Sequence, residues 1–295
     1  MIKKSLFVFV PVWGEDHIDW FFTYCLPSLM QEYNLPLVKN KKKIVFYFYT
    51  KEESADHLNR QIKNNIVDFE SKIYTENCFD DHARDMMSNY FIHILKECID
   101  KKSLLLFAQP DLIFSNGSID NMVNLSDGKG VSIAVASPRV SIECIKNNNV
   151  SVLCDGGKLT DIILTCQHQS LAFTDDLLDV NSTLEGISTR RIKNGIMVTH
   201  NLPPVFLCDP IKSDLSFFKR RPLFNIVDKL WPHMLFRQSR LKVVTSSDIA
   251  LVAELTHDND KKPKLSSNMK YNDFYKGFPP FVNYSNVSVG LWRNK

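Results

Sequence analysis

Residues 103–119 read SLLLFAQPDLIFSNGSI, and the rest of the chain is organised around this stretch. Residues 103–107 form an apolar run that is short enough to be a strand buried on both faces. The run breaks at Ala108, so the carboxylate of Asp111 stands just past the strand's end, and residues 115–118 predict a turn followed by a helix. Ligands of open α/β sheets bind outside the carboxyl ends of the strands, which makes Asp111 a candidate site residue. The alternative is a surface aspartate in an ordinary loop.

Composition sets broad limits on the class of protein. The chain has 295 residues, 44% of them hydrophobic, which is enough for one large domain or two ordinary ones. The net charge of +3 is mild, and a nucleic-acid partner normally requires a stronger and more clustered basic bias. The lysine-rich residues 39–43 indicate a solvated loop, with contact to phosphates or anionic lipid as the alternative.

The seven cysteines are scattered and odd in number, without a CxxC pair or a Cys/His metal spacing. They therefore predict free thiols in a reducing cytoplasm and support neither a zinc site nor a disulfide framework. Residues 6–10 are too short for the core of a signal peptide and predict a first strand instead. No apolar run approaches the roughly 18 residues of a membrane span.

Strands and helices alternate through the first half of the chain. We expect strands at 6–10, 43–50, 72–74, 103–107 and 131–136, and helices at 16–30, 55–64 and 80–100, the first of them kinked at Pro27. This alternation favours right-handed βαβ units and a mostly parallel sheet.

The pattern weakens after residue 140. Gly156-Gly157 predicts a turn, residues 159–171 a helix, and residues 200–210 an extended segment. Residues 241–246 and 249–255 bracket a turn at Ser247-Asp248, and the tail 261–295 is expected to pack on the body or to contribute to an oligomer contact.

Three short motifs give the first half a resemblance. Pro11-Val12-Trp13-Gly14-Glu15 follows the first strand, Ala83-Arg84-Asp85 opens the long helix, and Gln109-Pro110-Asp111 follows the central strand. In this order they resemble the nucleotide-sugar-binding half of GT-A-fold, family-2-like glycosyltransferases, in which a P-x-x-x-E loop meets the nucleobase, an A-R-N helix follows, and a D-x-D motif binds a divalent cation and the donor. The second half is similar to bacterial glycosyltransferase-like proteins with an H-x-x-P-x-x-x-x-x-P segment and a V-V-T-x-S-D segment, matched here at 200–210 and 243–248.

The resemblance implies an α/β fold: a GT-A-like, Rossmann-type, mostly parallel sheet flanked by helices, with a less regular acceptor-side portion. Residues 1–140 would bind the nucleotide sugar, residues 141–260 would form the acceptor-side half of the same domain, and residues 261–295 would be the tail. The implied activity is transfer of a sugar from a nucleotide-sugar donor to a glycan or lipid-linked acceptor in bacterial surface-polysaccharide synthesis. It would take place in the cytoplasm, with peripheral association at the inner membrane and an oligomer left open.

The same resemblance suggests site residues. The donor would be bound by a set drawn from the ends of several strands and from one helix: Pro11, Trp13, Gly14, Glu15, Thr50, Arg84, Gln109, Asp111 and Arg139. A divalent cation, Mn²⁺ or Mg²⁺, would stabilise the leaving diphosphate, with Asp111 as its ligand. Gln109 replaces the first acid of D-x-D and removes a charged ligand, so Asp111 either binds metal with waters or hydrogen-bonds donor hydroxyls directly. Arg84 and Arg139 would then supply positive charge to the diphosphate.

Three residues of the second half are candidates for catalysis. Asp248 is the candidate general base, with an aspartate in a tight hairpin turn as the alternative. His200 lies beside prolines in a loop-like segment and is either functional or structural, and Asp209 is a further candidate base.

Two other functions fit the same sequence. A nucleotidyltransferase would use the same strand ends, but it is expected to carry a glycine-rich, basic loop after the first strand, and Val12-Trp13-Gly14-Glu15 is neither. A non-catalytic nucleotide- or glycan-binding protein on a degenerate transferase fold is the other alternative, which the Gln109 replacement favours.

Overall fold

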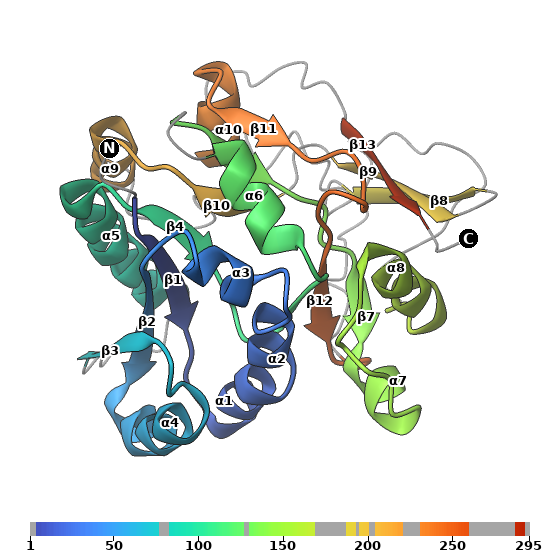
Figure 1. The fold of residues 1–295 in the computed structure, drawn as a ribbon, viewed down its shortest axis with the longest axis horizontal. Coiled ribbons are helices and arrows are strands. Elements are labelled where there is room, and N and C mark those ends of the chain that lie inside the picture. The colour runs from blue at the N-terminus through green and yellow to red at the C-terminus, as the bar shows by residue number, and fades with distance from the viewer. Residues whose placement is uncertain are drawn as a thin grey trace, which may run out of the picture.

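A computed structural model describes residues 4–76, 83–126, 130–168, 187–192, 195–200, 204–220, 231–259 and 287–292. Its centre is a seven-stranded sheet in the order β11-β6-β10-β4-β1-β2-β3 (Figure 1). β10 runs antiparallel to its neighbours β4 and β6, and the other pairs are parallel. This confirms the predicted mostly parallel sheet. The strands are β1 (Leu6–Pro11), β2 (Ile44–Lys51), β3 (Glu70–Glu76), β4 (Leu104–Phe107), β6 (Ser132–Ala134), β10 (Val205–Cys208) and β11 (Leu241–Val243).

Helices cover both faces of this sheet because its strands are apolar on both sides. Leu104 and Leu106 of β4 join one buried cluster, and Leu105 and Phe107 join the other. The first cluster is covered by α1 (Glu15–Trp20), a π-helical turn (Phe21–Cys25), α2 (Leu26–Leu29), α3 (Leu35–Lys39), α4 (Glu52–Asn65) and α6 (Ser118–Ser126). The second is covered by α5 (Ala83–Lys101), α9 (Lys212–Arg220) and α10 (Trp231–Arg237).

The predicted helix at 16–30 forms in three pieces. Pro27 occupies the first turn of α2, directly after the π-helical turn. A proline has no N–H to donate to the preceding turn, so the hydrogen-bond pattern shifts there while the chain stays helical.

A smaller sheet, in the order β5-β12-β7, joins the two halves of the chain. It consists of β5 (Leu112–Phe114), β12 (Val252–Thr256) and β7 (Arg139–Ser141), and it packs with α7 (Ile142–Asn147) and α8 (Gly156–Thr165) around a third buried cluster. β5 and β7 were not predicted, because both form by pairing with β12, which is far away in the sequence. A further sheet holds β8 (Ile187–Ile192), β9 (Gly195–His200) and β13 (Val287–Trp292), so residues 287–292 of the tail pair with β9, whereas 261–286 lie outside the described residues.

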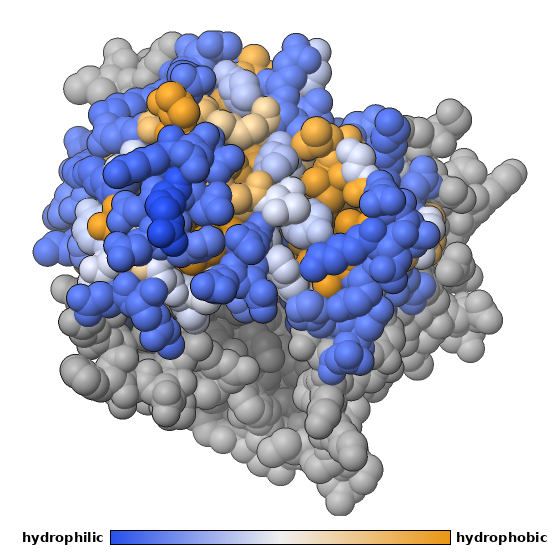
Figure 2. All heavy atoms as spheres, turned by 90° about the horizontal axis from the view of Figure 1, so that it is seen from below, coloured by the Kyte–Doolittle hydropathy of each residue, from blue (hydrophilic) through white to orange (hydrophobic). Residues whose placement is uncertain are grey.

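β1 and β2 run toward the lower side of Figure 1, the side that Figure 2 views directly. Polar residues cover most of the described surface there, and hydrophobic residues form smaller areas among them. Within the described ranges, no helix combines the length and the apolar character needed to cross a bilayer.

The predicted turn at Gly156-Gly157 is wrong. Both glycines belong to the first turn of α8, where the Asp155 carboxylate caps the helix by accepting from the Lys158 N–H at 2.8 Å. Among the described glycines Gly156 is tightly constrained: a Cβ there would lie 2.2 Å from the Ser247 carbonyl oxygen. Only a residue without a side chain fits between α8 and the turn at 246–250.

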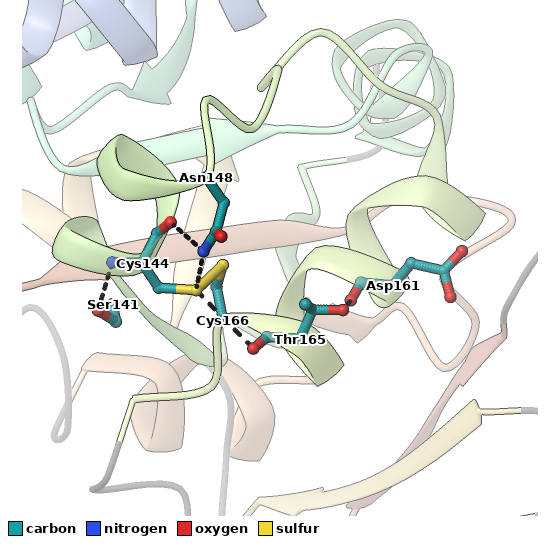
Figure 3. Close-up of a disulfide and its surroundings, with 6 residues drawn as sticks. All are labelled: Ser141, Cys144, Asn148, Asp161, Thr165 and Cys166. Atoms are coloured by element: carbon teal, nitrogen blue, oxygen red, sulfur yellow. Dashed lines mark hydrogen bonds between the residues drawn. A yellow bond between two sulfur atoms is a disulfide. The ribbon is translucent and has the colours of Figure 1, made fainter.

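The prediction that all cysteines are free is also wrong. Cys144 of α7 and Cys166, just after α8, form a disulfide across 22 residues of sequence (Figure 3). Their spacing has no motif signature, and the packing of α7 against the end of α8 brings them together. Cys25, Cys98, Cys154 and Cys208 are free and buried, and Cys78 lies outside the described residues.

Replacing Cys144 and Cys166 together by serine should lower the free energy of unfolding by about 3 kcal/mol, because the bridge restricts the unfolded chain. Urea unfolding measures this. A reductant should destabilise the wild-type chain to the same extent and leave the double variant unchanged. Equal wild-type stability with and without reductant would contradict the bridge.

Replacing Gly156 by alanine should cost about 2 kcal/mol, because the added methyl group meets backbone that cannot rotate away. The matched control is Lys158→Ala, an exposed position in the same helical turn, which should change stability little. Thermal unfolding compares the two, and an unchanged melting temperature for Gly156→Ala would show that α8 moves away freely.

Candidate functional site

The strand order creates one topological switch point. From β1 the chain crosses to β2 and β3 on one side, and then returns to β4 on the other side of β1. The loops that follow β1 and β4 therefore diverge from neighbouring strand ends, which is where open α/β sheets leave a crevice for ligands. These loops hold Trp13, Gly14 and Glu15, and Gln109 and Asp111. The strand-end position expected for Asp111 is thus the position that it has.

The loop after β1 is held by the neighbouring helix α4. Gly14 has a φ of 78°, which favours glycine, and its N–H donates to the Oγ of the buried Ser54 at 3.0 Å. Trp13 is partly buried, with its ring 6.5 Å from that of Tyr90. Pro11 is buried at the end of β1, and Glu15 is exposed in the first turn of α1. The partly buried Trp13 ring and the exposed Glu15 carboxylate are the groups that this loop offers to a ligand.

The loop after β4 is fixed by β12. The Leu255 N–H donates to the Asp111 carbonyl at 2.6 Å, and the Leu112 N–H donates to the Gln109 carbonyl at 3.2 Å. Both Gln109 and Asp111 are partly buried. Burial raises the pKa of the Cys25 thiol, and the charge of Asp111 raises it further, so one side of the Asp111 carboxylate faces the protein interior. Asp111 is therefore a partly buried carboxylate at the switch point.

Thr50 lies at the carboxyl end of β2 but is fully buried. Its carbonyl accepts from the Tyr90 hydroxyl at 3.1 Å, and its Oγ1 has no hydrogen-bond partner among the described residues. The Thr50 side chain is packed in the interior, so it offers no exposed contact to a ligand beside Trp13.

The two arginines have different surroundings. Arg84 lies in the first turn of α5, which starts on the side where β3 ends, and its side chain lies outside what the structure describes. Arg139 opens β7, and its Nε donates to Glu254 at 2.9 Å. Part of the charge of Arg139 is therefore already balanced by an acid of β12, which weakens the expectation that it neutralises a diphosphate.

Asp248 lies in the turn after β11, on the same side of the sheet as Asp111. Its side chain is exposed and accepts from the Ser246 hydroxyl at 3.3 Å, while its N–H donates to the same oxygen at 3.3 Å. This local turn is the alternative that the sequence left open, and the catalytic role of Asp248 stays a prediction. His200 ends β9, and its side chain lies outside the described part of the chain.

The structure places Asp209 at the opposite side of the sheet, which contradicts its role as a base beside Asp111. β10 is antiparallel to β4, so the residue after β10 lies where β4 begins. There the carboxylate is buried and accepts from the Lys4 Nζ at 2.5 and 2.6 Å and from the Gly130 N–H at 3.0 Å. Asp209 holds the amino ends of the strands together.

The lysine-rich segment 39–43 also lies away from the switch point, before β2. Lys41 pairs with Asp120 at 2.6 Å, Lys43 with Glu70 at 2.6 Å, and Lys39 with Asp68 at 4.0 Å. These pairs agree with a solvated loop in which the positive charges are balanced by neighbouring acids.

The donor set for a metal ion is incomplete. The residues that the structure describes contain no group of three or more His, Cys, Asp or Glu side chains that could hold a cation. Asp111 stands beside Gln109 instead of a second acid, and one of its oxygens is buried. These residues do not fit a cation held by the protein alone, and the metal dependence expected from the sequence stays a prediction.

Three residues near this region were not predicted. Ser54 holds Gly14, and His257 and Glu143 form a hydrogen-bonded pair beyond β12 and β7. Ser54 had no sequence signal, because a serine in a helix is common. His257 follows β12, which pairs with β5. Asp111 was located by the expectation that ligands bind beyond strand ends. The same expectation would have located His257 if β12 had been predicted as a partner of β5.

Comparisons with known proteins add little to this geometry. No protein-family model and no curated protein sequence matches the chain. Among solved structures it is similar to a 4-diphosphocytidyl-2C-methyl-D-erythritol synthase from Anaerococcus prevotii, at 11% identity and a TM-score of 0.42, covering 92% of this chain and 96% of that one. It is also similar to the inositol-1-phosphate CTP transferase from T. maritima, at 12% identity and a TM-score of 0.43, covering 89% and 94%. At such low identity and TM-score, the strand order and the contacts of this chain itself define its fold and its candidate site.

Asp209→Asn should lower the free energy of unfolding by about 3 kcal/mol, because it leaves Lys4 opposite a neutral, buried amide. Glu70→Gln is the matched control: it breaks an exposed ion pair with Lys43 and should cost under about 1 kcal/mol. Urea unfolding separates the two. Wild-type stability of Asp209→Asn together with lost ligand binding would return Asp209 to the site.

Proposed function

We propose that this chain is a transferase that binds a nucleotide-linked sugar across the β1/β4 switch point and moves the sugar to a hydroxyl of a glycan or lipid-linked acceptor. The observation that supports it best is that the loops after the neighbouring strands β1 and β4 diverge. The first loop offers the ring of Trp13 and the carboxylate of Glu15, and the second offers the carboxylate of Asp111. A location in the cytoplasm, with peripheral contact to the inner membrane where the acceptor is lipid-linked, belongs to the same proposal.

The groups in the two loops suit the parts of such a donor. The partly buried ring of Trp13 can stack on a base, and the exposed Glu15 can accept hydrogen bonds from base or ribose donors. Asp111 lies in the other loop, where its outer oxygen can accept from hydroxyls of the ribose or the sugar. Arg84 is the residue that we expect to face the diphosphate, because α5 begins on this side of the sheet.

Nucleotidyl transfer is the second candidate, because the same crevice would hold a nucleoside triphosphate. The loop after β1 carries no lysine or arginine, and α1 opens with Glu15 and Asp16. A triphosphate is more negative than a sugar diphosphate, so these acids would repel it more strongly, which favours glycosyl transfer.

Binding and product analysis test the proposal. The chain is titrated calorimetrically with UDP-, GDP- and CMP-linked sugars and with CTP and UTP, each with Mn²⁺, with Mg²⁺ and with chelator. We expect a sugar nucleotide to bind and Asp111→Asn to weaken binding about tenfold, the loss of one charge-assisted hydrogen bond. Asp68→Asn, an exposed acid before β3, is the matched control and should bind as the wild type.

The products separate the two reactions. Release of a nucleoside diphosphate or monophosphate from a sugar nucleotide supports glycosyl transfer, and release of pyrophosphate from CTP or UTP supports nucleotidyl transfer. Absence of binding by every nucleotide would contradict both.

A further inference from the structure

His257 and Glu143 form a hydrogen-bonded pair beyond the small sheet. The Nδ1 of His257 lies 2.6 Å from the Glu143 Oε1, and the Asp258 N–H donates to the Oε2 of the same carboxylate at 3.0 Å. The side chains of His257 and Glu143 are 46% and 38% exposed. When the Nδ1–H of a neutral imidazole donates to a carboxylate, the lone pair is on Nε2. The hydrogen bond to Glu143 therefore fixes the tautomer of His257.

The imidazole of His257 is held from several directions. Its ring centroid lies 4.7 Å from that of Trp20, a buried residue of α1. The backbone carbonyl oxygen of His257 lies 3.0 Å from the Nε2 of the buried His168. Glu143 lies in the first turn of α7, a helix that is capped by Ser141 and bridged through Cys144 to Cys166 (Figure 3). Such a pair is a pre-oriented base, because the carboxylate can stabilise an imidazolium as it forms.

The pair lies close to the switch point through the small sheet. His257 comes two residues after Leu255, whose N–H donates to the Asp111 carbonyl, so the Cα atoms of His257 and Leu255 are at most about 7 Å apart. Glu143 comes four residues after Arg139, which pairs with Glu254 of β12. On its other side the imidazole meets α1, the helix that begins at the Gly14 loop. His257 is thus connected to one loop of the switch point through β12 and to the other through α1.

We infer that His257, positioned by Glu143, is the base that takes the proton of the acceptor hydroxyl in the transfer reaction; the inference rests on the proposed function. In this step the O–H proton moves to Nε2, and the oxygen lone pair forms the bond to the anomeric carbon of the donor. The bond from that carbon to the phosphate oxygen breaks, and its electron pair leaves with the nucleotide. The half-exposed imidazolium then returns its proton to solvent.

Charges around the ring favour this role. Burial alone would raise the pKa of the Glu143 carboxyl, but its hydrogen bonds to His257 and to the Asp258 N–H outweigh burial and hold that pKa below its usual value. Glu143 therefore stays ionised and supports a positive charge on His257. Other titratable groups that contact the pair or Trp20 include His168, Asp258 and His17, whose ring is 5.6 Å from that of Trp20.

The test separates binding from turnover. Donor binding by the full chain is measured calorimetrically with the sugar-nucleotide panel, and turnover by release of nucleotide with water as the acceptor. We expect His257→Gln to bind the donor as the wild type does and to lose at least about 100-fold in turnover, the usual contribution of a general base. His93→Gln is the matched control, since His93 also uses Nδ1 in a hydrogen bond, at 2.7 Å from the Tyr49 hydroxyl, and lies on α5.

Glu143→Gln tests the positioning role. We expect about a tenfold loss of turnover, because a neutral amide at position 143 supports the imidazolium that forms less well than a carboxylate does. NMR of ¹⁵N-histidine-labelled protein should show His257 as the Nδ1–H tautomer in the wild type and as a mixture of tautomers in Glu143→Gln. Thermal unfolding of each variant shows whether it folds.

The outcomes are distinct. Wild-type turnover in a folded His257→Gln chain that binds the donor would overturn the inference and leave the proposed function intact. Loss confined to Asp248→Asn would overturn it in the same way. Absence of binding by every donor would overturn the proposed function, and the inference with it.

Discussion

The burial of β4 on both faces and both edges is the constraint on which the rest of the structure depends. Leu104, Leu105 and Leu106 are completely buried, between parallel β1 and antiparallel β10. Where β4 ends, the chain turns out of the sheet. Because β1 is the parallel neighbour of β4, this turn places Gln109-Pro110-Asp111 beside the end of β1. The position of the candidate site therefore follows from hydrophobic burial, with no contribution from the chemistry of the site.

The second half of the chain completes this arrangement. β10 extends the central sheet beside β4, and β12 pairs with β5 directly after the Asp111 turn. The Leu255 N–H that donates to the Asp111 carbonyl comes from a residue more than a hundred positions later in the chain. Such long-range pairing means that the Asp111 loop acquires its shape only when both halves have folded. The Asp111 loop and the His257–Glu143 pair are thus connected along β12.

Local patterns in the sequence predicted the first half well and the second half poorly. β1, β2 and β4 are apolar on both faces, and α5 has a regular periodicity, so their positions were evident. β5 and β7 have three residues each and exist because β12 pairs with both, which no local pattern encodes. Asp209 is a similar case. Its place in a predicted loop made it a candidate base, but its ion-pair partner Lys4 stands 205 positions away in the sequence. Strand ends can be predicted from local sequence, but which strand ends meet, and at which edge, depends on topology.

The disulfide next to Glu143 bears on the proposed location in the cytoplasm, where bridges between thiols are rare. The His257–Glu143 pair does not require the bridge for its position. The Ser141 Oγ accepts from the Cys144 N–H at 3.0 Å, and the Ser141 N–H donates to the Cys166 carbonyl at 2.8 Å, so hydrogen bonds already join α7 to the end of α8. Behind them, Ile142, Ile145 and Ile163 are buried in one apolar cluster. Because the bridge acts mainly by restricting the unfolded chain, its reduction would lower stability while leaving this geometry in place. A reducing compartment and an oriented His257 are therefore compatible.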